Sequence, residues 1–272
     1  MITVRERSIA TNRGPMFWLE AGAGWPVILL HAFPLEASIW RPQLEAVPAG
    51  WRFIAPDLRG FGRSPWSPPS TFARSGLTMD DYAADVFCLM DGLKLDDAVT
   101  GGLSMGGYVA FAMFRQAPRR FTGLVLADTR SQADTPAARQ VRLQLRELLR
   151  TGGPRALAEQ SLPKLFSAAA GPEVIGRTRA MIESAPAAAI DAAIVAMIER
   201  PDSTPGLPDI NCGTLVVVGE RDEITPVADA KAMQHAIPRS TLCVIPGAGH
   251  LSSLEQPDIF SRALGDFLVS PL

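Results

Sequence analysis

The chain has 272 residues, of which 47% are hydrophobic and 20% are charged, and its formal net charge at pH 7 is −2. This length and apolar content suffice for one large core that needs no metal or disulfide to hold it. The nearly balanced charge offers no basic surface for nucleic acid, so we expect a globular protein without a nucleic-acid partner.

The N-terminal stretch and the cysteines give an expectation for the cellular location of the protein. The stretch MITVRERSIATNRG carries charges where a signal peptide needs apolar residues, and no run approaches the roughly 18 apolar residues of a membrane span. Cys88, Cys212 and Cys243 are odd in number and widely spaced, which favours free thiols in a reducing compartment. No histidine stands at metal-ligand spacing with a cysteine or another histidine. We therefore expect a cytoplasmic protein with no membrane partner, no metal and no cofactor.

Short apolar runs alternate with helical patterns over the first 130 residues. Five strands are predicted, at residues 16–22, 26–32, 51–57, 97–103 and 121–128. Three of them are almost uninterrupted apolar runs, typical of strands that are covered on both faces of a parallel sheet. Three helices are expected between the strands, at about residues 36–47, 79–93 and 104–117. The alternation predicts an α/β fold with right-handed crossovers.

The pattern changes after residue 130. Residues 131–200 show no strand pattern, and four helical segments follow one another, the first ending at Gly152 and Gly153. Residues 201–210 form a predicted linker. Two strands then follow at 214–220 and 240–247, with helices at about 226–236 and 255–269. We therefore predict a core domain made of residues 1–130 and 201–272, with a helical cap domain at 131–200 inserted into it.

Several polar residues follow predicted strands, where the loops of an open α/β sheet gather reactive groups. Ser104 lies in GGLSMGG between a strand and a helix, and Gly102 and Gly106 let the backbone turn sharply there. A serine becomes nucleophilic when a base takes its proton, and that base needs a carboxylate to hold its tautomer. We therefore predict Ser104 as nucleophile, His250 as base and Asp222 as acid.

Asp128 and His31 are the alternative carboxylate and imidazole at strand ends. Asp128 precedes the helical segment and is expected to cap the exit of the chain from the sheet, whereas the chain order Ser, Asp, His favours Asp222. His31 directly ends an apolar strand. This position predicts a buried, hydrogen-bonded histidine that organises the following loop.

The reaction also needs donors for an oxyanion and a pocket for the acyl group. The backbone N–H of Met105, which follows the serine, and that of Phe33 in the loop HAFP are the candidate donors. The side chains of Phe33 and Met105 are also expected to face the acyl group. Four further apolar substrate-binding residues are predicted, namely Trp40, Leu162, Phe166 and Leu251.

The motifs HAFP, DLRGFGRS, GLSMGG, GERDEITP and GAGHLSSLEQP, in this order, resemble those of the α/β-hydrolase superfamily over nearly the whole chain. Within it, the chain resembles the branch of bacterial carboxylesterases and 3-oxoadipate enol-lactonases. The resemblance implies a mostly parallel eight-stranded sheet flanked by helices, with a helical cap after the sixth strand. It also implies the same roles for Ser104, Asp222 and His250, and for Phe33 and Met105 as oxyanion donors. Ala32 stands where this family usually has glycine.

The expected activity is hydrolysis of small carboxylic esters through an acyl-enzyme, so the expected partner is a small ester or lactone. An enol-lactonase, a perhydrolase that uses peroxide in place of water, and a non-catalytic ligand receptor on the same fold are the alternatives. An anionic lactone would need cations in the pocket. Arg139, Arg142 and Arg146 lie in the predicted cap, but their spacing is typical of a solvated helix face.

Overall fold

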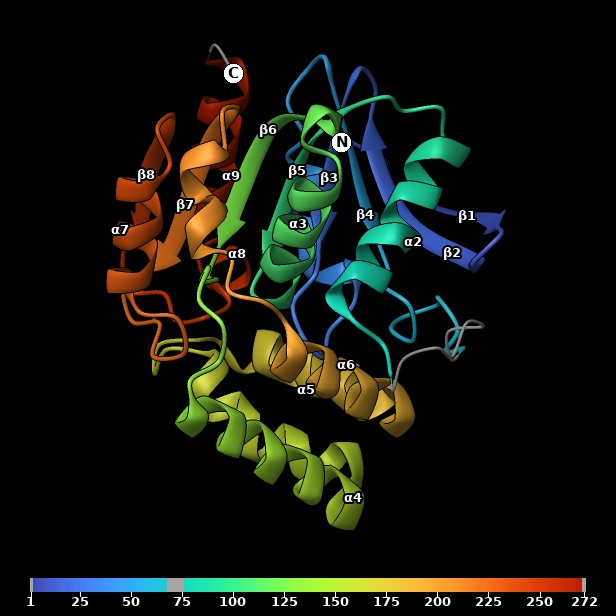
Figure 1. Cartoon of the computed structure of the whole chain (residues 1–272), viewed down its shortest axis with the longest axis vertical. Helices are drawn as coiled ribbons and strands as arrows, with labels where there is room; N and C mark the ends of the chain where they lie inside the picture. The colour runs from blue at the N-terminus through green and yellow to red at the C-terminus, as the bar shows by residue number, and fades with distance from the viewer. Residues whose placement is uncertain (1, 68–75, 271–272) are drawn as a thin grey trace.

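One eight-stranded sheet forms the centre of the protein (Figure 1). The computed structural model describes residues 2–67 and 76–270. The strands are β1 (Arg5–Thr11), β2 (Gly14–Gly22), β3 (Trp25–Leu30), β4 (Trp51–Pro56), β5 (Ala98–Leu103), β6 (Phe121–Ala127), β7 (Gly213–Gly219) and β8 (Ser240–Ile245). Their order is β1-β2-β4-β3-β5-β6-β7-β8. The pairs β1–β2 and β2–β4 are antiparallel and the others are parallel, so the expected mostly parallel eight-stranded sheet is confirmed.

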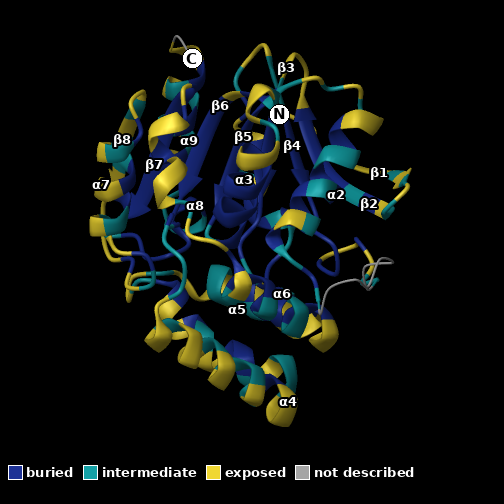
Figure 2. Cartoon of the chain, viewed as in Figure 1, coloured by how far each residue is buried: buried dark blue, intermediate teal, exposed yellow. Residues whose placement is uncertain are grey.

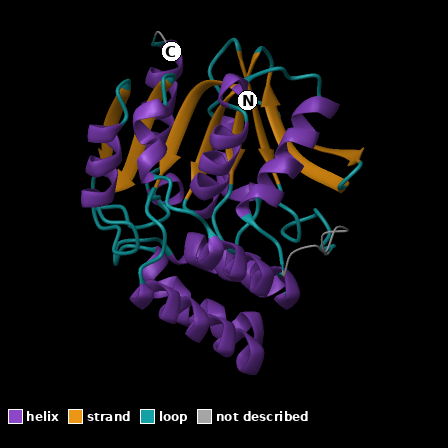
Figure 3. Ribbon diagram, viewed as in Figure 1, coloured by secondary structure: helices purple, strands orange, loops and turns teal. Residues whose placement is uncertain are grey.

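Helices flank the sheet (Figure 3). Those between the strands are η1 (Ala37–Trp40), α1 (Arg41–Glu45), α2 (Met79–Gly92), α3 (Met105–Gln116), η2 (Pro118–Arg120), η3 (Thr204–Asp209) and α7 (Val227–Ala236), and α8 (Ser252–Glu255) and α9 (Pro257–Val269) close the chain. Helices α2 and α3 pack side by side, and α1 packs against α9. The alternation of strands and helices is the one that the sequence predicts.

The inner strands of the sheet carry the core (Figure 2). Every residue of β5 and of β7 is buried, and Val27 to Leu30 on β3 are fully shielded from solvent. Strands with helices on both faces have no solvated side, so their apolar runs are not interrupted by polar residues. This burial is why the sequence reveals the inner strands clearly.

The structure differs from the sequence-based prediction at the edges. The sequence does not predict β1, because this edge strand pairs only with β2, most of its residues are exposed, and it begins with the charged residues Arg5, Glu6 and Arg7. The helix expected at 36–47 is divided into η1 and α1, and the last one into α8 and α9. The predicted linker at 201–210 contains the short helix η3. None of these differences moves the strand ends.

Three α-helices precede η3 between β6 and β7, and we call α4 (Pro136–Leu165), α5 (Pro172–Ser184) and α6 (Ala187–Glu199) the inserted helices. They lie across the carboxyl-terminal ends of the parallel strands (Figure 1). Helix α4 is interrupted at Gly153, which has a φ of 67°, so four helical segments are present. The N–H of Ser203 donates to the carbonyl of Ser131 at 2.9 Å, and the hydroxyls of Ser131 and Thr204 are 3.0 Å apart. The chain therefore leaves the sheet and returns to it at one place.

Two further observations concern the helices and the cysteines. Among the described residues, no helix by itself is long and apolar enough to cross a membrane, and α5 and α6 meet the length and composition criteria only as a pair bent by 97°. All three cysteines are unpaired, as their number and spacing predict.

Candidate functional site

Ser104 occupies a strained turn between β5 and α3. Its φ of 54° and ψ of −112° lie in a region that residues other than glycine rarely adopt. A Cβ atom on Gly102 would lie 2.2 Å from the carbonyl of Gly106, and one on Gly106 would lie 2.3 Å from the carbonyl oxygen of Leu30. The N–H of Ser104 donates to the carbonyl of Ala127 at 2.9 Å. The two glycines thus let the turn close and place the serine at the carboxyl end of β5.

Ser104, His250 and Asp222 form one hydrogen-bonded chain, although they follow three different strands. Nε2 of His250 is 2.8 Å from Oγ of Ser104, and Nδ1 is 2.8 Å from Oδ2 of Asp222. An ionised carboxylate only accepts hydrogen bonds, so Nδ1 carries the proton and Nε2 accepts from the serine hydroxyl. The structure therefore brings together the three residues that the sequence analysis selected.

Asp222 has the surroundings of an ionised carboxylate. Its Oδ1 accepts from the N–H groups of Ile224 and Thr225 at 2.8 and 2.9 Å, and its Oδ2 accepts from the Thr225 hydroxyl at 2.6 Å. Burial alone would raise the pKa of Asp222, but the charge and hydrogen bond of His250 and the bonds from Thr225 hold it below its usual range. Thr225 was not predicted. The spacing D-x-x-T, which favours a side-chain bond to the backbone two or three residues on, is the signal that could have revealed it.

The other carboxyl group at a strand end, Asp128, does not contact His250 in the described structure. Its Oδ1 accepts from the N–H of Gly219 at 2.8 Å, and its Oδ2 lies 2.5 Å from the hydroxyl of Ser252. Gly219 is the last residue of β7, just before the loop of Asp222, and Ser252 is the first residue of α8, just after the loop of His250. The expectation that Asp128 caps the exit of its own chain is therefore wrong, because the side chain bridges two neighbouring loops.

His31 is fully buried and organises the loop that follows β3. Its Nε2 accepts from the N–H of Leu58 at 2.9 Å, so its Nδ1 carries the proton and donates to the carbonyl of Ala32 at 2.9 Å. Burial lowers the pKa of His31 to about 4, although the hydrogen bond to Ala32 opposes this effect. The structural role predicted for His31 is confirmed.

The two backbone donors that the sequence analysis selected have no described protein acceptor. Met105 is the first residue of α3, whose leading N–H groups have no partner within the helix. Within residues 2–67 and 76–270, no backbone or side-chain atom accepts a hydrogen bond from the N–H of Met105 or of Phe33. Both groups are therefore free to bind an external acceptor.

A cavity of about 400 Å³ opens over Ser104 and His250, between the sheet and the inserted helices. Its volume falls within the range of small-molecule sites. Much of its wall is apolar, formed by Phe33, Pro34, Ala138, Val141, Leu145, Leu165, Met197 and Ile224. Tyr108, one helical turn after the serine on α3, also lines it and was not predicted, although its i,i+4 spacing from Ser104 places it on the same helix face.

The four predicted substrate-binding residues do not line this cavity in the described structure, nor does the side chain of Met105. Trp40 is fully buried against Phe260, with their ring centroids 5.7 Å apart. Leu162, Phe166 and Leu251 are buried in the main hydrophobic core. Apolar character alone does not distinguish a side chain that packs in the core from one that faces a cavity, and this is why the sequence analysis selected these four residues.

One cavity wall carries an excess of positive charge. The carboxylate of Asp134, whose side chain is 3% exposed, accepts from Nε of Arg142 and, at 2.7 Å, from a terminal nitrogen of Arg200. Arg142 and Lys164 both line the cavity. Two guanidinium groups therefore share one carboxylate on this wall, which leaves one positive charge uncompensated there, while the carboxylate of Glu223 also lines the cavity.

The outcome for the three arginines of α4 is mixed. Arg139 is exposed, and Arg146 pairs with Asp191 at 2.6 Å at the surface, as expected of a solvated helix face. For Arg142 that expectation is wrong, because its side chain is only 19% exposed and faces the cavity. The face of α4 that the sequence predicts to be solvated therefore points partly toward the cavity at Arg142.

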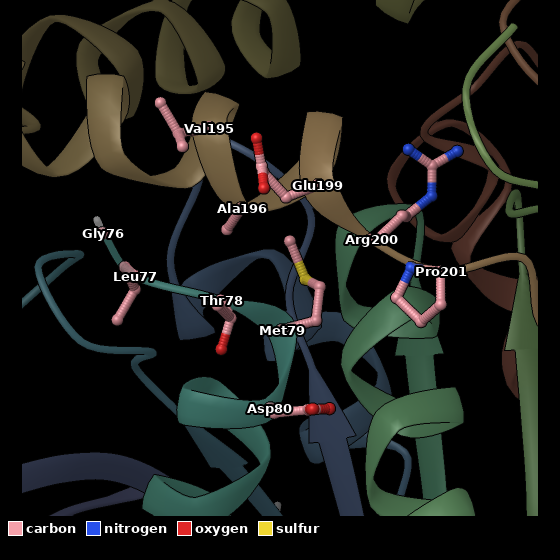
Figure 4. A pocket seen from close by; sticks show the side chains of 10 residues that line it. All are labelled: Gly76, Leu77, Thr78, Met79, Asp80, Val195, Ala196, Glu199, Arg200 and Pro201. Atoms are coloured by element: carbon pink, nitrogen blue, oxygen red, sulfur yellow. The ribbon is translucent and has the colours of Figure 1, made fainter. Parts of the chain in front are cut away.

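A second cavity, of about 690 Å³, lies between the start of α2 and the end of α6 (Figure 4). Its described lining includes Thr78, Asp80 and Glu199 but no histidine, cysteine or serine. The hydroxyl of Thr78 is already engaged as the cap of α2, where it accepts from the N–H of Asp81. The described residues also contain no group of three or more His, Cys, Asp or Glu side chains that could hold a metal ion. The cavity over Ser104 therefore remains the candidate site.

Known proteins resemble this chain in sequence. The sequence profile of the alpha/beta hydrolase fold family matches residues 26–257. A 3-oxoadipate enol-lactonase from Acinetobacter baylyi is 29% identical over 241 residues, which cover 88% of this chain and 86% of that enzyme. The similarity thus extends over most of both chains.

Solved structures resemble the protein as well. A thermophilic esterase from Thermogutta terrifontis, with malate bound, is 42% identical and superposes with a TM-score of 0.89 over 97% of this chain and 98% of its own. The enol-lactonase from Burkholderia xenovorans LB400 is 26% identical, with a TM-score of 0.87 over 97% of this chain and 100% of its own. The family profile, the sheet and these likenesses agree, and the chain belongs to the α/β hydrolase family.

Proposed function

We propose that the protein hydrolyses small carboxylic esters through an acyl-enzyme formed on Ser104. The observation that carries this proposal is the chain of two 2.8 Å contacts from Ser104 through His250 to Asp222. This chain ends at a serine hydroxyl that faces a cavity of about 400 Å³. The likeness to a named esterase and to enol-lactonases supports cleavage of an ester bond.

In the first half of the reaction, Nε2 of His250 takes the proton of Ser104 as Oγ attacks the ester carbonyl carbon. The carbonyl oxygen becomes an oxyanion, which accepts from the N–H groups of Phe33 and Met105. The tetrahedral species then expels the alcohol, which leaves with the proton held by His250. An acyl ester of Ser104 remains.

In the second half, His250 takes a proton from water, and the resulting hydroxide attacks the acyl carbon. The second tetrahedral species releases the carboxylic acid, and Oγ of Ser104 regains the proton from His250. In both halves the imidazolium lies beside ionised Asp222, whose negative charge stabilises it.

We further propose that residues 131–200 form a cap domain that shapes the acyl pocket. Val141, Leu145 and Leu165 on α4 and Met197 on α6 line the cavity above Ser104. These side chains form an apolar surface for the acyl chain. The length of the acyl chain is thus set by the inserted helices, whereas the bond-breaking groups belong to the sheet.

The test is turnover of 4-nitrophenyl acetate and butyrate by the parent and by Ser104→Ala, with Ser270→Ala, an exposed serine at the end of α9, as matched control. We expect the parent and Ser270→Ala to turn over many equivalents, and Ser104→Ala to lose at least about a thousandfold in kcat. Equal rates for the parent and Ser104→Ala would refute the mechanism. Release of one equivalent of 4-nitrophenol followed by stable retention of the acyl group would indicate a ligand receptor.

The charge on the cavity wall favours a second candidate, hydrolysis of an ester or lactone that carries a carboxylate, as an enol-lactonase does. Asp134 neutralises only one of Arg142 and Arg200, so a substrate carboxylate in the cavity would meet an uncompensated positive charge. A guanidinium group in a partly shielded cavity binds a carboxylate more strongly than one in water.

This candidate is tested with substrates that differ only in charge. Monomethyl adipate is compared with its neutral primary amide, for the parent, for Arg142→Gln and for the control Arg146→Gln, whose side chain does not line the cavity. A carboxylate site predicts that Arg142→Gln raises KM for the acid about tenfold or more and leaves the amide unaffected. A parent enzyme that prefers the amide would exclude this candidate.

A further inference from the structure

Asp128 and Thr129 follow β6 at the centre of the candidate site, between the strands that carry Ser104 and Asp222. Both side chains are almost fully buried, at 0% and 2% exposure. The reaction sequence proposed above uses neither of them. Their hydrogen bonds nevertheless reach all three loops of the site.

The carboxyl group of Asp128 joins two of these loops. Gly219, whose N–H donates to Oδ1 at 2.8 Å, stands three residues before Asp222. Ser252, whose hydroxyl lies 2.5 Å from Oδ2 and whose N–H lies 3.3 Å from it, stands two residues after His250. Asp128 therefore links the acid loop to the base loop through its side chain, beside the direct bond from the N–H of Arg221 to the carbonyl of Ala248 at 2.8 Å.

Thr129 reaches the third loop. Its hydroxyl donates to the backbone carbonyl of Ser104 at 2.8 Å, and that serine has the unfavourable φ of 54°. Asp128 itself has a φ of 44°, again in the left-handed region. A residue of this kind keeps such a conformation only when its surroundings hold it there, and such positions concentrate at functional sites.

The charge state of Asp128 follows from its neighbours. Around its carboxyl group the structure places the polar groups of Gly219 and Ser252 and the carboxylate of Asp222, with no cation among its described hydrogen-bond partners. Burial, reinforced by the negative charge of Asp222, raises the pKa of Asp128 well above its ordinary value, which the bonds from Ser252 and Gly219 offset only in part. Two neighbouring buried carboxyl groups with one imidazole between the loops are best accommodated when only Asp222 is ionised.

We propose that Asp128 and Thr129 are positioning residues for the hydrolytic site, Asp128 acting as a neutral acid that fixes the loops of Asp222 and His250, and Thr129 fixing Ser104. The inference rests on the proposed function, because it concerns the same three groups. The hydroxyl of Ser252 donates to Oδ2 when the carboxyl group is ionised; in the neutral form the proton on Oδ2 turns toward the hydroxyl oxygen of Ser252 instead, and Oδ1 accepts from Gly219. Neutral Asp128 thus adds no second negative charge beside the imidazole.

The experiment compares Asp128→Asn, Asp128→Ala and Thr129→Val in turnover of 4-nitrophenyl butyrate, per site labelled by a fluorophosphonate. An amide offers a donor and an acceptor like a protonated carboxyl group. We therefore expect Asp128→Asn to keep kcat within about threefold and to leave the acid limb of the kcat/KM pH profile in place. Asp128→Ala and Thr129→Val should lower kcat about tenfold to a hundredfold with little change in KM, because the reacting groups lose their alignment.

Two control variants separate positioning from a general loss of stability. Asp85→Asn removes another buried carboxylate, which pairs with Arg59 and Arg13 away from the three loops. Thr100→Val removes a buried hydroxyl on β5 that has no described partner. Both should change the melting temperature without changing kcat per labelled site. Ser252→Ala is the second variant if Asp128→Ala does not fold, and it should lower kcat in the same way.

Two results would overturn the inference. Parental kcat per labelled site in Asp128→Ala, or in Ser252→Ala if Asp128→Ala does not fold, would show that the carboxyl group positions nothing. A shift of the acid limb to lower pH by about one unit in Asp128→Asn would show that Asp128 is ionised. Failure of the proposed function would be distinguishable, because the fluorophosphonate would then not label Ser104 even in the parent protein.

Discussion

The hydroxyl of Thr225 donates to Oδ2 of Asp222 at 2.6 Å, the same oxygen that lies 2.8 Å from Nδ1 of His250. Oδ1 accepts from two backbone N–H groups of the same loop. The carboxylate is thereby held in one plane and one rotamer, aimed at the imidazole. The hydroxyl of Thr225 also lies beside the imidazole itself, with Oγ1 3.3 Å from Nδ1 of His250.

Replacing Thr225 by valine should therefore lower kcat about tenfold while KM stays within about twofold, since the carboxylate loses one donor and part of its orientation. The measurement is steady-state hydrolysis of 4-nitrophenyl butyrate. Thr178→Val is the control, because Thr178 is buried on α5 and its hydroxyl has no described partner. Unchanged kcat in Thr225→Val would mean that the backbone donors alone hold Asp222.

Gly106 should not tolerate a methyl group. A Cβ atom there would lie 2.3 Å from the carbonyl oxygen of Leu30, and backbone cannot yield as a flexible side chain can. We expect Gly106→Ala to lower the free energy of unfolding by about 3 kcal/mol or more, since α3 must move away from β3. Gly176→Ala on α5 meets no atom within 4 Å and should stabilise its helix by up to about 1 kcal/mol. Urea denaturation of both variants measures the contrast, and equal stabilities would contradict it.

Arg200 joins the two ends of the inserted helices to each other and to α3. It donates to the carbonyls of Gln132 and Met197, at 2.9 and 2.7 Å, and to Asp134, and its guanidinium carbon lies 4.1 Å from the ring centroid of Tyr108. Lysine cannot reproduce these planar contacts. Arg200→Lys should therefore loosen the inserted helices by about 3 kcal/mol.

Hydrogen exchange followed by mass spectrometry checks this expectation for Arg200→Lys. Peptides from residues 131–200 should exchange faster than in the parent, whereas peptides from β5, β6 and β7 should keep their protection. The surface variant Arg150→Lys, which alters a pair within α4, serves as control. Uniform acceleration in all peptides would show instead that Arg200 stabilises the whole protein.

The burial of His31 should lower the free energy of unfolding in acid. Burial lowers its pKa to about 4 from an ordinary value of 6.5, so between these pH values the unfolded chain binds a proton that the folded chain does not. The contribution of His31 is complete above pH 6.5 and declines as the pH falls toward 4, by about 3 kcal/mol in total. Asp57 has the opposite effect, because burial raises its pKa to about 6 and the folded state binds its proton first.

A comparison with His31→Gln isolates this contribution, since glutamine can accept from Leu58 and donate to Ala32 but does not titrate. Urea denaturation at pH 7 and pH 4 gives four free energies of unfolding. The advantage of the parent over the variant should shrink by about 3 kcal/mol between the two pH values. Groups common to both proteins, such as Asp57, cancel in this difference. An advantage that does not depend on pH would contradict the expected pKa of His31.

The site residues that could be predicted are those whose neighbours in the sequence reveal their local structure. Ser104 is marked by glycines that the turn demands, and Asp222 and His250 are marked by strands that end just before them. The edge strand β1 escaped because one open side lets charged residues occupy it. Most of the cavity lining could not be predicted, because it depends on which face of α4 turns toward the cavity. Arg142, expected at the solvated surface, lines the cavity, whereas Leu162, expected in the cavity, is buried in the core.

The hydrogen bonds that join Ser131 to Ser203 and Thr204 mean that about 70 residues of inserted chain begin and end at neighbouring points. Chain closure at this point costs nearly the same for a longer or a shorter insertion, because its entropy grows only slowly with length. Lineages that share this sheet can therefore exchange, shorten or rebuild their inserted helices while the strand register stays intact. Substrate range can then diversify without renewed selection on the machinery that breaks the bond.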